Sequence, residues 1–272
     1  MPRSELRIGC QTFTWEMLGK GWTGDARDLV RAIAAGGYDG LEITDRMIGD
    51  YGARPVAFAE LLKDEGLAFV SFAIGSSSGF TQREKVASDL DFAKQSIDFA
   101  AHFPGTLVSL GSATAVSDRP RDEMFDVAAE CYNRTWDLGK EAGVSVAIHP
   151  SSHHRTLLFT REDYDDIFAR LDPGVGWVPD TGHILRGGQD LADTLAAFKD
   201  RIRYVHLKDV DSGGNWAMLG AGECDVPSTI GSVRDAPHFN GWIVVEEESN
   251  EAGGDPAAAV RINRETLRTM GF

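Results

Sequence analysis

The chain alternates short apolar, β-branched runs with longer amphipathic stretches, and the apolar runs recur eight times. Such runs predict β-strands, and apolar residues at 3.6-residue spacing predict helices between them. The predicted strands cover residues 6–13, 38–44, 67–75, 106–111, 144–150, 175–182, 202–209 and 241–249. The predicted helices cover residues 29–34, 58–66, 83–102, 121–142, 161–171, 190–199 and 257–270.

Strands that alternate with helices imply a parallel sheet. Eight such units in 272 residues predict an α/β fold of the (β/α)8 TIM barrel type. No low-complexity stretch or Pro/Ser-rich linker interrupts the pattern, so we expect a single barrel domain over residues 1–272. The alternative is an open doubly wound sheet, which favours a Gly-rich phosphate loop after an early strand. Neither GxGxxG nor a Walker A sequence is present.

The charge balance limits the kinds of partner. The chain has 42 acidic and 27 basic residues, a net charge of −15. This excess argues against a nucleic-acid backbone and against an anionic membrane surface. No apolar run approaches the ~20 residues of a membrane span, and the first residues contain no apolar targeting segment. We therefore expect a cytoplasmic protein with a small-molecule substrate, and a homo-oligomer stays open.

The three cysteines, Cys10, Cys131 and Cys224, are far apart and odd in number. They fit a reducing compartment without a disulfide framework. We expect them to be small buried side chains with no part in the chemistry.

Polar side chains stand where the last four predicted strands end. They are His149, Asp180, His206 and Glu246. The C-terminal ends of barrel strands build the active site of this fold, and buried charges are costly unless they are paired or bind a metal. A nitrogen and oxygen donor set without thiolate suits a divalent ion. We expect one bound divalent ion. Mn2+ or Co2+ is the first expectation, and Mg2+, Fe2+ and Zn2+ are the alternatives.

Other polar residues near the strand ends have two interpretations each. Glu42 is either part of the site or a salt bridge at the barrel mouth. Lys208 either stabilises an oxyanion or pairs with a strand-end carboxylate. Glu247 and Glu248 are expected to be solvated or to support the ligands from behind, because successive strand residues face opposite sides.

Several segments resemble one known group of enzymes. They are DTGH (180–183), HLKD (206–209), LGAGECD (219–225) and GWIVVEEES (241–249), with IGCQTFTW (8–15) and GYDGLEI (37–43) similar to the first two strands. This pattern resembles the sugar phosphate isomerase/epimerase superfamily, the xylose-isomerase-like TIM barrels, over essentially the whole chain. The resemblance implies one divalent metal ion bound by His149, Asp180, His206 and Glu246.

One position departs from the ketose epimerases of that superfamily, which have glutamate where this chain has His149. In those enzymes two glutamates are both metal ligands and the acid/base pair. The HPSSHH segment (149–154) and GGNWAMLGAG (213–222) instead resemble the inosose dehydratase branch.

The resemblance implies a carbohydrate enzyme that acts on a keto-sugar or keto-inositol through an enediolate. A metal that polarises the carbonyl and a base that removes the adjacent proton give this intermediate. We expect a lyase, a dehydratase like inosose dehydratase. The alternative is a ketose epimerase or sugar isomerase; an apurinic endonuclease-like DNA repair enzyme or a non-catalytic barrel is expected less.

The residue roles follow from this chemistry. Glu246 or His149 is expected to be the base, His183 or His153 the acid, and Lys208 the stabiliser of the oxyanion. Trp15, His153 and Trp216 are expected to bind the substrate, with core packing as the alternative for each tryptophan.

Overall fold

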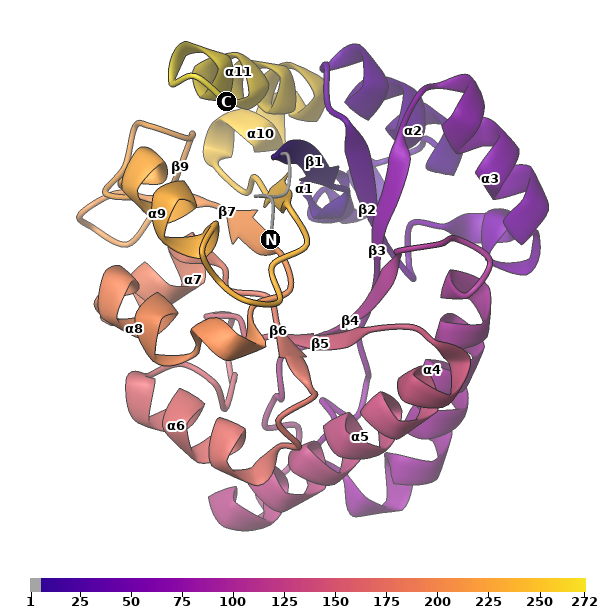
Figure 1. Ribbon diagram of the computed structural model, residues 1–272, viewed down its shortest axis with the longest axis vertical. Helices are drawn as coiled ribbons and strands as arrows, with labels where there is room; N and C mark the ends of the chain where they lie inside the picture. The colour runs from indigo at the N-terminus through magenta and orange to yellow at the C-terminus, as the bar shows by residue number, and fades with distance from the viewer. Residues whose placement is uncertain (1–5) are drawn as a thin grey trace.

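The computed structural model describes residues 6–272 and confirms the barrel (Figure 1). Eight parallel strands run in the order β6-β5-β4-β3-β2-β1-β10-β7, and two isolated parallel bridges, Trp177–Ile202 and Asp180–His206, join the two ends. These strands are β1 (Arg7–Gln11), β2 (Gly40–Thr44), β3 (Ala68–Ile74), β4 (Leu107–Gly111), β5 (Val146–His149), β6 (Gly176–Trp177), β7 (Val205–Leu207) and β10 (Trp242–Val245). Closure of the barrel brings the C-terminal ends of strands that are distant in the sequence to the same rim.

Helices surround the ring of strands, as Figure 1 shows. They are α1 (Phe13–Glu16), α2 (Ala26–Ala35), α3 (Pro55–Asp64), α4 (Val86–Ala100), α5 (Arg121–Ala142), α6 (Arg161–Arg170), α7 (Thr181–Arg186), α8 (Leu191–Ala197), α9 (Val226–Val233), α10 (Asn250–Gly254) and α11 (Pro256–Thr269). Local signals fix several ends. Asp25 and Thr160 form capping boxes at α2 and α6, and Gly143 ends α5 with φ +72°, which favours glycine.

Two apolar layers hold the barrel together. The larger lies between strands and helices, and a separate buried cluster contains Val178, Ala147, Tyr204 and Val244. Each of these four residues precedes a predicted ligand by two positions, and side chains two apart in a strand share a face. The predicted ligands therefore lie next to this buried apolar cluster, on the C-terminal side of the barrel.

Two predicted strands end several residues early in the structure. The sixth, predicted to reach 182, ends at Trp177, because Asp180 caps α7, which begins at Thr181. The eighth, predicted to reach 249, ends at Val245, because Ser249 caps α10. Capping hydrogen bonds satisfy backbone N–H groups that strand pairing would otherwise use.

The seventh predicted strand divides in two. After β7, Asp209–Val210 (β8) pairs antiparallel with Trp216–Ala217 (β9) in a hairpin that the sequence did not predict. The Asp209 carboxylate accepts hydrogen bonds from the backbone N–H groups of Gly220, Gly222 and Cys224 at 2.9–3.0 Å. The segments HLKD and LGAGECD are therefore one structural unit.

All three cysteines are buried and unpaired with one another, as expected. Within residues 6–272 no helix has both the length and the apolar character needed to cross a membrane.

Candidate active site

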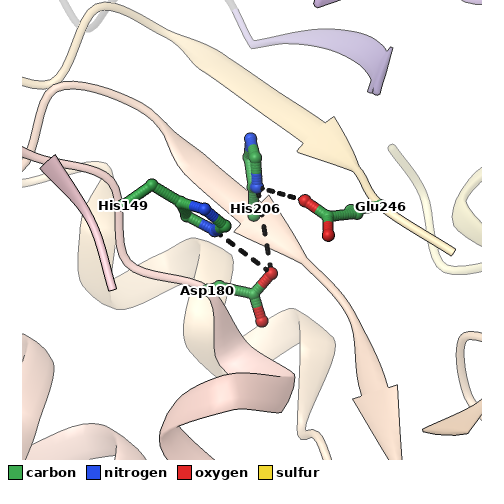
Figure 2. A group of neighbouring side chains, drawn as sticks. All are labelled: His149, Asp180, His206 and Glu246. Carbon is green, nitrogen blue, oxygen red and sulfur yellow. Dashed lines mark ion pairs between the residues drawn. The ribbon is translucent and has the colours of Figure 1, made fainter. Parts of the chain in front are cut away.

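The four predicted ligands converge at the C-terminal rim of the barrel, and Figure 2 shows their side chains pointing toward one another. His149 Nε2 lies 3.7 Å from Asp180 Oδ2, and His206 Nδ1 lies 3.8 Å from the same oxygen. Glu246 Oε2 lies 2.8 Å from His206 Nδ1. One donor atom from each residue lies within 4.8 Å of the others. We call these residues the ligand cluster.

Three buried polar atoms of the ligand cluster have no hydrogen-bond partner in the described structure. They are His149 Nε2, Asp180 Oδ2 and His206 Nδ1. An unpaired polar atom in the interior is costly, and buried polar groups are nearly always paired. Two imidazole nitrogens and two carboxylates at this spacing form a donor set suited to a divalent cation. The residues present therefore fit a bound divalent metal ion.

Asp180 divides its carboxylate between two tasks. Oδ1 accepts a hydrogen bond from the backbone N–H of His183 at 2.8 Å and caps α7, while Oδ2 faces the ligand cluster. The local cap orients the side chain, so that the second oxygen points inward.

A carboxylate from the opposite side of the barrel orients His206. Glu42 Oε2 lies 2.9 Å from His206 Nε2, and Gln11 donates to Glu42 Oε1 at 2.7 Å. Because Glu42 accepts from Nε2, the other nitrogen of His206 faces the ligand cluster. Burial opposes a charge on His206, but Glu42 and Glu246 outweigh it and raise the pKa of His206 to about 10.

Lys208 lies beside the ligand cluster, and its side chain is 1% exposed. Its Nζ donates to Glu246 Oε1 at 2.6 Å, forms an ion pair with Glu248, and lies 3.3 Å from His183 Nε2. Burial opposes ionisation of Glu246, but the Lys208 ammonium outweighs it and holds the pKa of Glu246 well below its usual value. Glu246 is therefore an ionised carboxylate.

The glycine of DTGH makes room for this lysine. A Cβ at Gly182 would lie 2.8 Å from Lys208 Cγ and 2.9 Å from Trp216 Cζ3. Real Cβ atoms essentially never approach so closely, so a side chain here would displace Lys208 or Trp216.

An open cavity of about 310 Å³ extends from the ligand cluster. Its wall includes two members of the cluster, His149 and Glu246, and also His153. Hydroxyl groups are frequent in the rest of the wall, which contains Thr44, Ser76, Ser109, Ser112, Thr114 and Ser151. The cavity is thus lined by groups that exchange hydrogen bonds with a polyol.

The structure separates the predicted site residues into two groups. His149, His153 and Glu246 line the cavity, whereas His183 and Lys208 are buried behind it. Trp15 is 2% exposed and packs against Trp22, so it belongs to the core. Trp216 lies over Lys208, with Nζ 4.5 Å from the ring centroid, and outside the cavity wall.

Of the two alternatives expected for Glu247 and Glu248, solvated groups or groups that support the ligands from behind, the structure excludes the first, because neither side chain is solvated. Glu247 is 2% exposed and accepts from Ser249 and Asn263. The side chain of Glu248 is 7% exposed and pairs with Lys208. Both lie between the end of β10 at Val245 and the start of α10 at Asn250. The alternation of side chains along a strand therefore no longer applies to them.

Two aromatic residues that line the cavity, Phe13 and Phe80, were not predicted as site residues. They lie in segments that follow β1 and β3, and neither stands at the end of a predicted strand among polar residues. Glu42 was noted, but its contact with His206 joins positions 164 residues apart. Only the closed barrel brings them together.

Comparisons with known proteins agree with this architecture. A family model described as xylose isomerase-like TIM barrel matches residues 30–270. Over 154 residues the chain is 30% identical to an inosose dehydratase of Geobacillus thermodenitrificans, covering 50% of this chain and 51% of that relative. The chain spans about half the length of the first curated relatives it matches. A longer match, 25% identical over 281 residues, is to an inosose dehydratase of Lactiplantibacillus plantarum and covers 91% and 93% of the two chains.

Solved structures show the same fold. The 3-keto-D-glucoside 4-epimerase of E. coli has a TM-score of 0.76 at 20% identity, covering 97% of this chain and 100% of that one. The IolI protein, solved with a bound zinc atom, has a TM-score of 0.78 at 15% identity and covers 96% of both chains. The His/Asp/Glu cluster of this chain is a group of side chains that could hold a divalent metal ion. On the family match and the shared architecture, the chain belongs to the xylose isomerase-like TIM barrel family.

Proposed function

We propose that this chain is a metal-dependent dehydratase that acts on a keto-inositol or a related keto-sugar. The observation that carries the proposal is the ligand cluster at the cavity wall, in which β5 contributes the imidazole of His149 in place of a carboxylate. The inosose dehydratases among its relatives support the same reaction class.

The ligand cluster would hold the metal through His149, Asp180, His206 and Glu246. A divalent ion bound there supplies Lewis acidity, which polarises a substrate carbonyl and makes the adjacent C–H more acidic.

Glu246 is the proposed proton acceptor, with His149 as the alternative, because both line the cavity. Glu246 is ionised beside Lys208, so it can accept a proton without first losing one. A single carboxylate on the cavity side of the cluster suits removal of one proton followed by loss of a β-hydroxyl. Epimerisation needs a second base on the opposite face of the same carbon.

His153 is the proposed donor to the leaving hydroxyl, since His183 does not line the cavity. The side chain of His153 is 45% exposed, and its Nε2 lies 3.6 Å from Glu248 Oε1. Burial, followed by the Lys208 ammonium, lowers the pKa of His153 to about 4. The imidazole is therefore neutral at pH 7 and would donate a hydrogen bond to the leaving hydroxyl through its N–H. The proton that converts this hydroxyl to water would come from Glu246, which accepts it from the carbon in the first step.

The charge of the cavity wall favours an uncharged substrate. Glu16, Glu42, Asp45 and Glu246 lie in the wall, and Arg46 is the one Arg or Lys among its residues. Arg46 Nη1 is already 3.4 Å from Glu16 Oε1. A neutral polyol with hydrogen-bonding hydroxyls fits this wall better than a phosphorylated sugar.

Incubation of the metal-loaded protein with keto-inositols, 3-keto-sugars and free ketoses tests the reaction class. We expect enone absorbance, which reports elimination, together with uptake of solvent deuterium next to the carbonyl. In His149→Glu with metal retained, elimination should fall while deuterium exchange persists. If the wild-type protein epimerises free ketoses and yields no elimination product from any keto-sugar, the dehydratase proposal is wrong.

A further inference from the structure

A second group of ligand-type side chains lies next to the ligand cluster. His153, His183 and Glu248 each offer one donor atom, and these three atoms lie within 4.8 Å of one another. We call them the second cluster. Two imidazoles and a carboxylate form the ligand set of many divalent metal sites with an open coordination position.

Two members of the second cluster, His183 and Glu248, contact the ammonium group of Lys208. Lys208 Nζ donates to Glu246 Oε1 at 2.6 Å and to Glu248 Oε1, and it lies 3.3 Å from His183 Nε2. The Trp216 ring, with its centroid 4.5 Å from Nζ, adds a cation–π contact. The site therefore already contains a positive charge that is paired with two carboxylates.

His183 is held on both sides of its ring. Its Nε2 lies 3.3 Å from Lys208 Nζ, while its Nδ1 accepts a hydrogen bond from the backbone N–H of Ser152 at 3.0 Å and lies 2.8 Å from Ser152 Oγ. These contacts fix the imidazole beside the ammonium group.

Glu246 connects the two clusters. Its Oε2 faces His206 Nδ1 in the ligand cluster at 2.8 Å, while its Oε1 accepts from Lys208 at 2.6 Å. A carboxylate with one oxygen on each of two cations is the bridging ligand of a two-metal site. Lys208 Nζ occupies the position of the second cation.

The two clusters contrast in one respect. The ligand cluster has three buried polar atoms without partners, whereas Lys208 Nζ supplies a cation to the second cluster. We propose that Lys208 acts as a built-in substitute for a second metal ion and restricts this site to one. This inference rests on the proposed use of the ligand cluster by a metal.

Metal stoichiometry tests the proposal directly. Wild-type protein, Lys208→Met and the surface control Lys140→Met are dialysed against Zn2+ or Co2+, and bound metal per chain is measured by mass spectrometry. Met keeps the length of the side chain without its charge. We expect one equivalent for wild type and Lys140→Met, and two for Lys208→Met. The double variant Lys208→Met/Glu248→Gln should return to one.

A Lys208→Met protein that folds and binds the same amount of metal as wild type would overturn the proposal, as would a wild-type protein that binds two equivalents. If Lys208→Met does not fold, His183→Ala in the wild-type background gives the answer. It should keep one equivalent, with a Kd within about twofold of wild type, and a loss of metal would contradict the proposal.

The two proposals fail in different ways. The stoichiometry proposal depends on the difference in bound metal between Lys208→Met and wild type, whereas the proposed function depends on product formation. A protein that gains one equivalent in Lys208→Met but eliminates no hydroxyl would refute the dehydratase and leave the role of Lys208 intact.

Discussion

Asp180 and His183 are joined through one carboxylate oxygen: Asp180 Oδ1 accepts a hydrogen bond from the His183 backbone N–H at 2.8 Å, and Oδ2 faces the ligand cluster without a hydrogen-bond partner in the described structure. One side chain therefore acts both as a helix cap and as a candidate metal ligand. The two tasks can be separated by substitution.

Asp180→Asn should lose metal while keeping the cap. Asn caps helices about as well as Asp, but its amide nitrogen has no lone pair for a metal. We expect the free energy of unfolding of the metal-free Asn variant to exceed that of Asp180→Ala by about 1 kcal/mol, the usual value of a cap. Urea unfolding and metal analysis measure the two effects. Wild-type metal content in Asp180→Asn would exclude Asp180 as a ligand.

Glu42→Gln should weaken metal binding without removing a ligand. Glu42 fixes the ring of His206 through Nε2, and loss of such a partner typically costs 10–100-fold in metal affinity. We expect a loss of about that size in a competition titration with a chelator. Glu60→Gln, a substitution at an exposed glutamate of α3, is the matched control and should bind metal as wild type does. Equal affinities of the two variants would contradict the role of Glu42.

His153 should make the folded protein sensitive to acid. Its folded pKa of about 4 lies below the value of about 6.5 for an unfolded chain, because burial and then Lys208 disfavour the imidazolium. The folded state therefore binds fewer protons, and stability falls as the pH is lowered from about 6.5 to 4. In His153→Gln the fall in unfolding free energy between pH 7 and pH 5 should be smaller. An unchanged pH dependence would show that His153 is not the group responsible.

The cysteines should be inert in the folded protein. Burial raises the pKa of Cys131 to about 12 and that of Cys224 to about 11, and it also raises the pKa of Cys10. The thiolate is the reactive form, and at pH 8 about one in a thousand Cys224 side chains carries it. We expect slow labelling by a thiol reagent at pH 8, and three reactive thiols in denaturant. Rapid labelling of the folded protein would show an exposed or activated thiol.

Much of the barrel could be predicted from the sequence, because its signals are local. Strand runs with β-branched residues and amphipathic helices identified all eight barrel strands, and the polar residues at their ends supplied the members of the ligand cluster. Ends of elements were less predictable. The caps at Asp180 and Ser249 ended two strands early, since a side-chain hydrogen bond competes with strand pairing at those positions.

The environment of each side chain could not be read from the sequence. Trp15 and Trp216 have the same side chain, yet one packs in the core and the other covers Lys208. Phe13 and Phe80 line the cavity because of the conformation of the segments after β1 and β3. Aromatic residues suit both locations, so residue type alone does not distinguish them.

The sequence by itself determined which side chains stand at the strand ends, because an alternating strand with a period of two fixes which residues share a face. The tertiary structure decided what each of those side chains does. The positions of β2, β7 and β10 in the barrel placed Glu42 against His206 and Lys208 between Glu246 and Glu248. Those contacts set which nitrogen of His206 faces the ligand cluster, and they set the ionisation of Glu246. They join strands far apart in the sequence, and in the barrel interior the strength of a charge interaction depends on the distance and burial of its partner.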